Sequence, residues 1–353
     1  MEKLKKIAIS PQLTVRQVLQ HIDGTGERTL FVIDGSGVIM GSVTDGDIRR
    51  WILKGKRLGE PISKVMFKNP VTVNEDYNLE EIKNLMVSRR MDCVPVLNKK
   101  RELVSSVRWI DLFGKKIPKQ KIHGLPVILM AGGEGKRLHP FTSVLPKPLM
   151  LIGQKTIVER IIDNFIEFGC KEFYLSINYK ANLIKAYFTD LPKQAYKIKY
   201  ILEDKPLGTA GSLVFLKDKI NTTFCVSNCD VLVNADLSDI VKFHKKSRNA
   251  MTLVGSMKHF TIHYGVCKVE KNGILQRIEE KPEYDYLVNT GMYILEPKVL
   301  KYIQRNKMFH MTDLIAALKT GGQKVGVYPI SEKSWLDMGQ FEELKEMLKK
   351  YGE

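Results

Sequence analysis

Long apolar runs are absent from the sequence. No stretch of its 353 residues approaches the roughly 18 consecutive apolar residues that a membrane-spanning helix needs. The basic segment Met1–Lys6 is followed by Ser10 and Pro11, where a secretory signal would carry an apolar core. We therefore expect a cytoplasmic protein that does not bind a membrane.

Cysteine is scarce and shows no metal-binding spacing. The five cysteines contain no C-x-x-C pair: Cys93, Cys170, Cys225, Cys229 and Cys267. An odd number of cysteines in a chain without a signal peptide is typical of free thiols. Cys225 and Cys229 have no second pair to complete a zinc site, so we interpret them as small buried hydrophobic residues.

Acidic residues are fewer than basic ones, and the formal net charge is +17. This excess is divided almost equally between the first 120 residues and the rest, and no arm or stripe concentrates it. Nucleic-acid binding is typically marked by a basic face or stripe, so we do not expect it here. A diffuse positive surface favours small polyanionic substrates.

The segment Leu125–Leu149 carries the strongest signal. The apolar run Pro126–Ala131 is typical of a strand buried on both faces of a parallel sheet. A cluster of glycines and basic residues follows it: Gly132, Gly133, Gly135, Lys136, Arg137 and, between two prolines, Lys147. Glycine allows a sharp turn whose N–H groups can contact phosphate, and arginine matches phosphate geometry. The segment therefore predicts a triphosphate-binding loop.

Two other phosphate-binding motifs do not fit this loop. A dinucleotide-binding turn requires an acidic residue about twenty positions downstream, and the chain has Leu151, Ile152 and Gly153 there. A P-loop requires a hydroxyl residue after Gly-Lys, and that position is Arg137. A Gly-rich turn without function would explain the glycines, but not the added Arg137 and Lys147.

Residues 1–114 contain an internal repeat with an offset of 64 residues. Apolar positions recur at this offset, for example Val43 with Val107, and so does Asp47 with Asp111. Each copy predicts a helix, two short strands and a second helix. A repeat of this length indicates a duplicated small domain and not a solenoid.

After the glycine loop the chain alternates between predicted helices and strands, which is the pattern of a doubly wound α/β sheet. We expect helices over 156–168 and 182–188, strands over 172–178, 198–202 and 224–230, and a hairpin at Asn272-Gly273. A last amphipathic helix is expected over 340–351.

The motifs G-G-x-G-x-R-L and P-K-P-L resemble the signature of the sugar-1-phosphate nucleotidyltransferases, and the resemblance extends from Leu125 to the C-terminus. It implies a Rossmann-like mixed sheet with the second ligand loop at 203–211. It also implies seven nucleotide-binding residues: Ala131, Gly132, Gly133, Gly135, Glu203, Gly208 and Thr209. Three residues are implied as catalytic: Arg137, Lys147 and Lys281.

The same resemblance implies a metal site and a sugar site. Asp230, at a strand end, and Asp337, in Trp335-Leu336-Asp337-Met338-Gly339, are implied as ligands of Mg²⁺, which usually takes one or two protein carboxylates. The implied sugar-binding residues are Tyr264, Gly265, Glu280, Asn289 and Thr290. Without the resemblance, a strand-terminal Asp is a common turn residue and the Glu279-Glu280-Lys281 run a solvated hairpin face.

The segment Gly41–Arg49 resembles the G-h-h-T-x-x-D-I-R motif of CBS domains, which form tandem pairs and commonly bind adenine nucleotides. By resemblance, Thr44 and Asp47 contact ribose hydroxyls. In the second copy Asp111 is retained but Arg108 replaces the threonine, which puts that half-site in doubt. A regulatory nucleotide site and a purely structural or dimerising pair both remain open, and we expect a homo-oligomer.

We therefore expect a tandem CBS pair over 1–118, with repeats at about 1–58 and 65–114, a polar linker over 119–124 and a catalytic domain over 125–353. The expected substrates are a nucleoside triphosphate and a sugar 1-phosphate. GTP is preferred because the Glu203 carboxylate can accept from both N1–H and the N2 amino group of guanine, whereas the family's pyrimidine enzymes tend to have Gln.

The complete arrangement resembles the guanylyltransferases of legionaminic acid biosynthesis, which act on glucosamine 1-phosphate. Mannose 1-phosphate, a uridylyl or thymidylyl transfer, and a catalytically silent nucleotide sensor that acts through the CBS pair are the alternatives.

Overall fold

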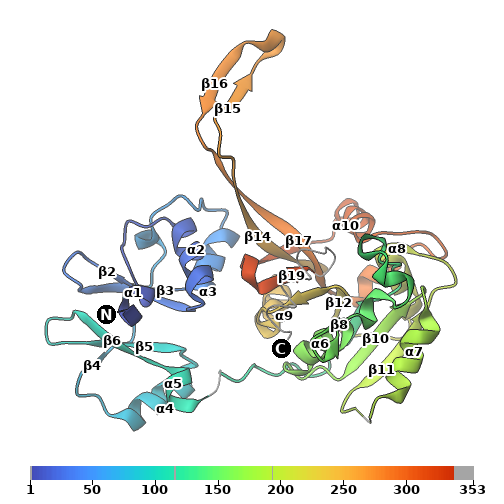
Figure 1. The fold of residues 1–353 in the computed structure, drawn as a ribbon, viewed down its shortest axis with the longest axis horizontal. Coiled ribbons are helices and arrows are strands. Elements are labelled where there is room, and N and C mark those ends of the chain that lie inside the picture. The colour runs from blue at the N-terminus through green and yellow to red at the C-terminus, as the bar shows by residue number, and fades with distance from the viewer. Residues whose placement is uncertain (1, 115–116, 193, 338–353) are drawn as a thin grey trace. The chain divides into compact units, whose positions relative to one another are not determined.

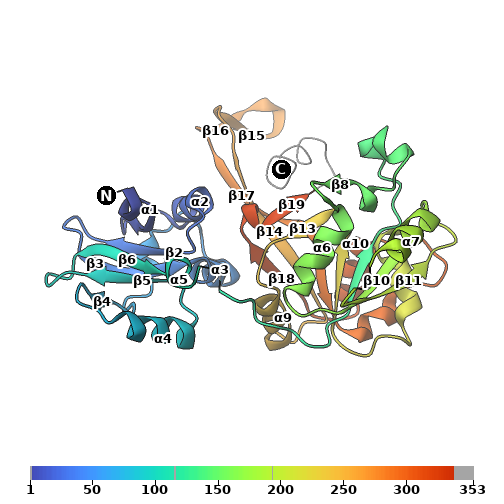
Figure 2. The ribbon, with the colours of Figure 1, turned by 60° about the horizontal axis from the view of Figure 1, so that its bottom comes forward.

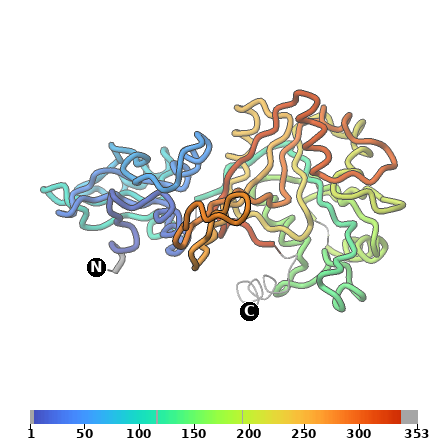
Figure 3. The backbone as a smooth tube through the Cα atoms, turned by 90° about the horizontal axis from the view of Figure 1, so that it is seen from above, coloured from blue at the N-terminus to red at the C-terminus, as the bar shows by residue number. Residues whose placement is uncertain are grey.

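The computed structural model describes residues 2–114, 117–192 and 194–337. The chain forms two compact units, Met1–Pro118 and Lys119–Glu353. Each unit is one continuous stretch, so the backbone passes between them once, as the colour gradient of Figure 3 shows. None of the described helices is long and apolar enough to cross a membrane. The helix expected over 340–351 and Gly339 of the tryptophan motif lie outside the described residues.

The first unit consists of two copies of one small α/β motif, which confirms the internal repeat. Each copy has a three-stranded sheet, in the orders β1-β2-β3 and β4-β5-β6, whose first two strands are parallel and last two antiparallel. The elements of the first copy are α1 (Glu2–Ile7), β1 (Ala8–Ile9), α2 (Val15–Thr25), β2 (Thr29–Ile33), β3 (Ile39–Thr44) and α3 (Asp45–Leu53). Those of the second copy are β4 (Val73–Asn74), α4 (Leu79–Arg89), β5 (Cys93–Leu97), β6 (Leu103–Arg108) and α5 (Trp109–Phe113).

One apolar cluster joins the two repeats. Phe31 and Ile39 of the first copy pack with Cys93 and Leu97 of the second, and all four are buried. Backbone hydrogen bonds from Ile39 N to the carbonyl of Arg101, 3.1 Å, and from Leu103 N to that of Gly37, 2.9 Å, pair the two hairpin turns. The pair of repeats is therefore one folding unit with a shared core.

The second unit is a three-layer α/β domain. Its helices are α6 (Ile157–Ile166), α7 (Ala181–Asp190), α8 (Gly208–Gly211), α9 (Leu237–Lys246) and α10 (Met311–Thr320). The strands of its main sheet are β7 (Val127–Met130), β10 (Glu172–Ile177), β11 (Lys197–Leu202), β12 (Phe224–Asn228), β14 (Met251–Thr261), β17 (Glu283–Leu295) and β18 (Val325–Ile330). Three short strand pairs accompany it: β8 (Leu151–Ile152) with β9 (Lys155–Thr156), β13 (Val231–Val233) with β19 (Trp335–Asp337), and β15 (Val266–Val269) with β16 (Leu275–Glu279).

The main sheet has the order β11-β10-β7-β12-β17-β14-β18. Strands β11, β10, β7 and β12 are mutually parallel, while β17 is antiparallel to both β12 and β14. This mixed sheet confirms the predicted fold class, and Figure 2 shows α6 lying across it.

Period-two alternation along β7 explains why the sheet is covered on both faces. Val127 and Leu129 are buried in the cluster that includes α6, α7 and α9. Ile128, between them, is buried in the opposite cluster with Leu213 and with the α10 residue Leu314. Helices that sandwich a largely parallel sheet leave its carboxyl edge open, and ligands typically bind there.

Strands β14 and β17 continue past the main sheet as a two-stranded ribbon. The β15–β16 hairpin lies at its end and projects away from the sheet (Figures 1 and 2), and we call residues 260–284 the arm. The predicted hairpin at Asn272-Gly273 is present, because β15 and β16 pair antiparallel across it.

The segment 119–124, predicted as a linker, packs against the second unit. Lys119 Nζ lies 2.5 Å from a carboxylate oxygen of Glu167, and Lys121 Nζ donates to the carbonyl of Glu167 at 2.9 Å. Ile122 N donates to the carbonyl of Phe168 at 2.6 Å. The lysines of this predicted polar linker therefore bind the C-terminal end of α6, where backbone carbonyls lack helical partners.

Candidate active site

A cavity of about 430 Å³ lies beyond the carboxyl ends of β7 and β12. It brings together the glycine loop, the loop after β11 and the end of β12, which are separate segments of the sequence. Its lining residues are Met130, Gly132, Gly133, Gly135, Lys136, Arg137, Leu138, Lys147, Glu203, Pro206, Leu207, Gly208, Thr209, Asn228, Cys229 and Asp230. Nine of the residues expected at the site from the sequence therefore line one cavity. Ala131 precedes the loop and is buried in the sheet core.

Gly135 is required by the shape of the glycine loop. Its φ is +67°, and a Cβ there would lie 2.9 Å from the methyl carbon of Thr142 and 3.3 Å from Cβ of Lys147. The buried Thr142 hydroxyl donates to the carbonyl of Gly135 at 3.0 Å. The loop is thus closed over the segment that carries Lys147, while Gly133 has open space around it and can approach a ligand.

Lys147 is buried, with 7% of its surface exposed, and its Nζ lies 2.5 Å from Oδ2 of Asp230. It begins a 3₁₀ turn, Lys147–Leu149, flanked by Pro146 and containing Pro148. The two prolines fix the backbone there, so the ammonium group is directed into the cavity. A buried ammonium retains its charge at low cost only if it is paired, and Asp230 provides that partner.

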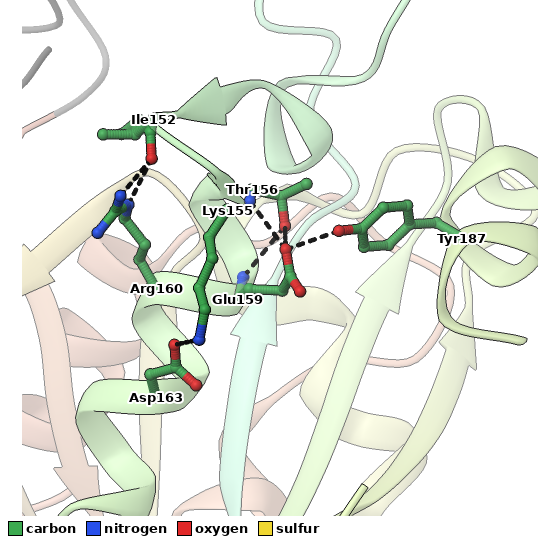
Figure 4. A network of polar contacts seen from close by, with 7 residues as sticks. All are labelled: Ile152, Lys155, Thr156, Glu159, Arg160, Asp163 and Tyr187. Atoms are coloured by element: carbon green, nitrogen blue, oxygen red, sulfur yellow. Dashed lines mark hydrogen bonds and ion pairs between the residues drawn. The ribbon is translucent and has the colours of Figure 1, made fainter. Parts of the chain in front are cut away.

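A network at the start of α6 anchors the chain that follows Lys147 (Figure 4). Arg160 donates two hydrogen bonds to the carbonyl of Ile152, and Thr156 caps α6 with Glu159 in a reciprocal capping box. The Tyr187 hydroxyl donates to the same Glu159 carboxylate at 2.6 Å. Burial would raise the pKa of Glu159, but the hydrogen bonds from Tyr187 and Thr156 outweigh it and lower that pKa. The carboxylate therefore stays ionised and holds the β8–β9 hairpin in place.

Glu203 lies in the cavity wall at the end of β11 and is 9% exposed. One carboxylate oxygen accepts from the Ser176 hydroxyl at 2.6 Å, and the other accepts from the Leu207 N–H at 3.1 Å. The carbonyl of Glu203 accepts from the Asn178 side chain at 2.6 Å. These hydrogen bonds fix the carboxylate in position. Each of its oxygens has a second lone pair, so the group can still accept a hydrogen bond from a ligand.

The loop after Glu203 is held by the segment before α10. Gly208 has φ +79°, and a Cβ there would lie 2.7 Å from the carbonyl oxygen of Phe309. Thr209 Oγ1 accepts from the Met311 N–H at 2.9 Å. These contacts place Gly208 and Thr209 in the cavity wall beside Pro206 and Leu207.

The two predicted metal ligands come from paired strands. Asp230 immediately precedes β13, and the register of β13 with β19 places Asp337 opposite Val231. Two carboxylates at neighbouring positions near the glycine loop suit a Mg²⁺ ion, which prefers oxygen ligands and keeps several waters. Among the described residues no group of three or more acidic, histidine or cysteine side chains forms a metal cluster, so the fit rests on these two carboxylates alone.

Cys229 lines the same cavity as Asp230, but its environment makes it unreactive. Burial, aided by the neighbouring Asp230 charge, raises the pKa of the Cys229 thiol to about 12. Because the thiolate is the nucleophilic form, this thiol is not suited to covalent catalysis. Cys225 is also buried, as predicted, and the five cysteines are free.

The residues predicted to bind sugar fall into two groups. Asn289 and Thr290 are on β17 next to Gly291, whose Cβ position would lie 2.6 Å from the side chain of the cavity residue Asn228. Asn289 Nδ2 donates to the Tyr293 hydroxyl, and Thr290 Oγ1 donates to the carbonyl of Val254. This pair therefore lies beside the cavity.

Tyr264, Gly265 and Glu280 of the predicted sugar site lie on the arm and do not line the cavity. Lys281, predicted as catalytic, also lies on the arm and outside the cavity lining. The hairpin places Gly265 next to Glu280, and a Cβ added at Gly265 would lie 3.0 Å from a carboxylate oxygen of Glu280. The expectation of one sugar pocket is therefore not met in this structure, because β14 and β17 continue as a ribbon and carry these residues away from the sheet (Figure 1).

The predicted CBS ligands are engaged with their own sequence neighbours. Thr44 caps α3: its hydroxyl accepts from Asp47 N at 3.3 Å, and Asp47 Oδ2 accepts from Thr44 N at 2.8 Å. Asp47 also pairs with Arg50. In the second repeat Asp111 accepts two hydrogen bonds from Arg108, both at 2.8 Å.

Several residues near the site were not among the predicted site residues, and three of them are Ser176, Asn178 and Asn228. Ser176 and Asn178 position Glu203, and Asn228 lines the cavity. Ser176 carried a usable signal, because a polar residue inside the apolar strand Glu172–Ile177 must find a partner when it is buried.

The comparisons with known proteins divide the chain at the same place as the structure. Residues 126–353 match the model of the nucleotidyl transferase family, and residues 4–54 and 62–117 match that of the CBS domain. The chain belongs to the nucleotidyl transferase family. Its N-terminus is a CBS pair.

Relatives with assigned names match over the transferase region. The chain is 30% identical over 224 residues to the mannose-1-phosphate guanylyltransferase catalytic subunit beta of Dictyostelium discoideum. The matched region covers 61% of this chain and 61% of the relative. It is 28% identical over 236 residues to a UTP–glucose-1-phosphate uridylyltransferase of Synechocystis, covering 61% of this chain and 60% of the relative. The chain thus spans about three fifths of the length of these relatives.

Solved structures show the same fold at low identity. The crystal structure of HddC from Yersinia pseudotuberculosis superposes with a TM-score of 0.51 at 23% identity and covers 64% of this chain and 99% of that one. A Bacillus anthracis structure described as a putative glucose-1-phosphate thymidylyltransferase gives a TM-score of 0.50 at 20% identity, over 65% of this chain and 95% of that one.

Proposed function

We propose that the second unit transfers a nucleotidyl group from a nucleoside triphosphate to a sugar 1-phosphate and releases pyrophosphate. The observation that carries this proposal is the single cavity in which the glycine loop, Arg137, Lys147, Glu203 and Asp230 meet. Backbone N–H groups and two cations suit a triphosphate, and the buried carboxylate suits a nucleobase. The family membership and the names of the relatives support the same reaction.

In the proposed reaction an oxygen of the sugar phosphate attacks the α-phosphorus of the triphosphate. A new P–O bond forms as the bond to the β-phosphate oxygen breaks, and pyrophosphate leaves. The attacking oxygen is already ionised, so no general base is needed. Arg137 and Lys147 align the phosphates and neutralise their charge. A Mg²⁺ ion held by Asp230 and Asp337 would supply further charge neutralisation when bound.

Among the nucleobases, guanine is the one we propose. The Glu203 carboxylate is fixed by Ser176 and Leu207 and retains two lone pairs, which match the adjacent N1–H and N2–H donors of guanine. Several of the relatives are named mannose-1-phosphate guanylyltransferases, while one is named a uridylyltransferase. Glucosamine 1-phosphate, as in legionaminic acid biosynthesis, is the proposed sugar substrate, and mannose 1-phosphate is the alternative.

A pyrophosphate-release assay tests the proposal. The full chain is incubated with Mg²⁺, each of the four common nucleoside triphosphates in turn and a panel of sugar 1-phosphates that includes glucosamine, mannose and glucose. We expect release with GTP that depends on both the sugar phosphate and Mg²⁺. Tight GTP binding without turnover on any sugar phosphate would contradict the transferase and indicate a nucleotide sensor.

A further inference from the structure

A second cavity, of about 450 Å³, lies in the same unit as the candidate active site and shares no residue with it. It is lined by His244, Lys245, Arg248, Asn249, Glu296, Pro297 and Lys298. The register of β12 with β17 pairs Phe224 with Leu295, so this cavity lies near the amino end of β12. The candidate active site lies past the carboxyl end of the same strand. The two cavities are therefore at opposite edges of the sheet.

The floor of the second cavity is polar and buried. His244 is fully buried, with Nδ1 at 2.8 Å from the Thr252 hydroxyl and Nε2 at 3.0 Å from Oε1 of Glu296. Burial lowers the pKa of His244 although the Glu296 contact opposes it, so the ring is neutral at pH 7. The same Glu296 oxygen accepts from the Thr223 hydroxyl at 2.8 Å. The side chains at the floor of the cavity are therefore held in place by a network of hydrogen bonds.

One member of this floor lacks a hydrogen-bond partner. Asn249 is 3% exposed and donates from Nδ2 to the Thr252 hydroxyl at 2.9 Å. Its Oδ1 atom has no hydrogen-bond partner within the described part of the chain. Asn249 Oδ1 lies 3.3 Å from the Cβ position of Gly326 and is enclosed by the protein, so the charged groups at the cavity rim are the ones that can contact a ligand.

The rim of the cavity is cationic. Lys245, Arg248 and Lys298 are exposed, and none of them forms an ion pair with another described residue. Glu296 is the one carboxylate among the lining residues, and one of its oxygens is already engaged. Three unpaired cations around a concavity repel one another, and an anion that binds there relieves the repulsion.

We propose that this cavity binds a small phosphate-bearing organic molecule. The Arg248 fork and the ammonium groups of Lys245 and Lys298 suit the phosphate, and the remaining carboxylate capacity of Glu296 suits a hydroxyl of the same molecule. A cavity of this size falls in the range of small-ligand sites. Sugar phosphates and nucleotides share this chemistry. The site is independent of the proposed transferase reaction, because no residue of that reaction lines it.

Binding to the full chain is measured with three probes: inorganic phosphate, glucose 6-phosphate and AMP. Calorimetry gives the dissociation constants, and hydrogen exchange of residues 244–249 locates the site. The test variant is Arg248→Gln/Lys298→Gln. The matched control, Lys219→Gln/Lys246→Gln, removes the same charge from exposed positions outside both cavities. The substituted side chains of both variants are exposed, so both should fold.

We expect glucose 6-phosphate or AMP to protect residues 244–249 in the wild type and the control. In the test variant its dissociation constant should rise at least about tenfold, the effect typical of losing a charged hydrogen bond. The probe that binds more tightly assigns the ligand as a sugar phosphate or a nucleotide. Absence of protection by all probes, or equal affinity in the test variant and the wild type, would overturn the proposal. Inorganic phosphate binding as tightly as both organic probes would overturn the assignment of an organic ligand.

Discussion

The candidate active site and the CBS ribose motif differ in where their polar residues find partners. In the active site Lys147 pairs with Asp230, which is 83 positions away, and Glu203 pairs with Ser176, which is 27 positions away. In the first unit Thr44 pairs with Asp47, and Arg108 with Asp111, at a separation of three positions, although Arg108 also lies 3.6 Å from Glu27 of the other repeat.

Local pairs of this kind have a sufficient structural explanation. A threonine and an acid three residues apart form a capping box, and Thr14 with Gln17 does the same at the start of α2 without any ribose motif. A buried ion pair between distant segments has no such local explanation and is costly to desolvate. A pair between distant segments therefore needs the tertiary fold, whereas a motif satisfied by its own sequence neighbours is explained by local structure alone.

The largest expected effect comes from breaking the distant pair. Lys147→Ala should reduce the rate of pyrophosphate release by about 10²- to 10³-fold, because it removes a positive charge aimed at the reacting phosphates. Asp230→Asn should act in the same direction. Steady-state assays with GTP and glucosamine 1-phosphate, or with the sugar phosphate that supports turnover, measure the loss.

Lys136→Ala is the matched control. Lys136 lines the same cavity, but it is exposed and pairs with Glu134, two residues away. Thermal melts establish that the variants are folded. If Lys147→Ala is folded and retains a rate close to that of Lys136→Ala, the assignment of Lys147 is wrong.

Glu203→Gln should have a smaller effect and a different signature. One acceptor becomes a donor, so one guanine N–H loses its partner, at a cost of about 1–3 kcal/mol. The ratio of kcat/KM for GTP to that for UTP should therefore fall roughly tenfold or more, while Mg²⁺ dependence is unchanged.

Ser176→Ala tests whether the effect comes from the base contact. It removes a hydrogen bond to Glu203 but leaves the carboxylate intact, so it should lower activity without inverting the base preference. An unchanged GTP-to-UTP ratio in Glu203→Gln would contradict guanine recognition by this residue.

The sequence predicted the segments that line the cavity where short motifs lie next to strongly patterned elements. The apolar run 126–131, the glycine loop and the acid after β12 were each identified, because buried strands and φ-positive turns restrict residue choice locally. That these segments line one cavity follows from the parallel order of β11, β10, β7 and β12, which periodicity alone does not determine.

Neither the course of the arm nor the docking of 119–124 could be predicted from the sequence. Residues 260–284 alternate as any hairpin does, and nothing in the alternation shows whether the ribbon bends over the cavity or continues away from it. Lys119 and Lys121 have the composition of a solvated linker, but their partner carbonyl and carboxylate come from the end of α6. Contacts of this kind depend on tertiary placement.

A third prediction addresses the local pair in the first unit. Asp47→Ala removes the acid of the α3 capping box, and Gln17→Ala removes its counterpart in α2, so both should lower stability by a similar amount of about 1 kcal/mol. If Asp47 also binds ribose, only Asp47→Ala should weaken AMP, ATP, GMP or GDP binding to the full chain in calorimetry. Equal nucleotide affinity in both variants would leave capping as the role of Asp47 and favour a structural or dimerising CBS pair.

The smallest effect is expected from removing the first unit. The candidate catalytic residues follow Leu125, so a chain that begins at Lys119 contains all of them. Its kcat and KM should therefore stay within about twofold of those of the full chain, the size of effect typical of changes far from a functional site. A chain that begins at His123 loses the Lys119–Glu167 ion pair and the Lys121 and Ile122 hydrogen bonds. Exposed ion pairs contribute about 0–1 kcal/mol each, so this shorter chain should melt a few degrees lower with the same kinetic constants.

Comparing the two start points separates the stabilising role of 119–122 from any role of the CBS pair. A large loss of kcat in the chain that begins at Lys119, with an unchanged melting temperature, would instead show that the first unit takes part in catalysis. The local polar pairs of the first unit would then have a functional role as well as a structural one.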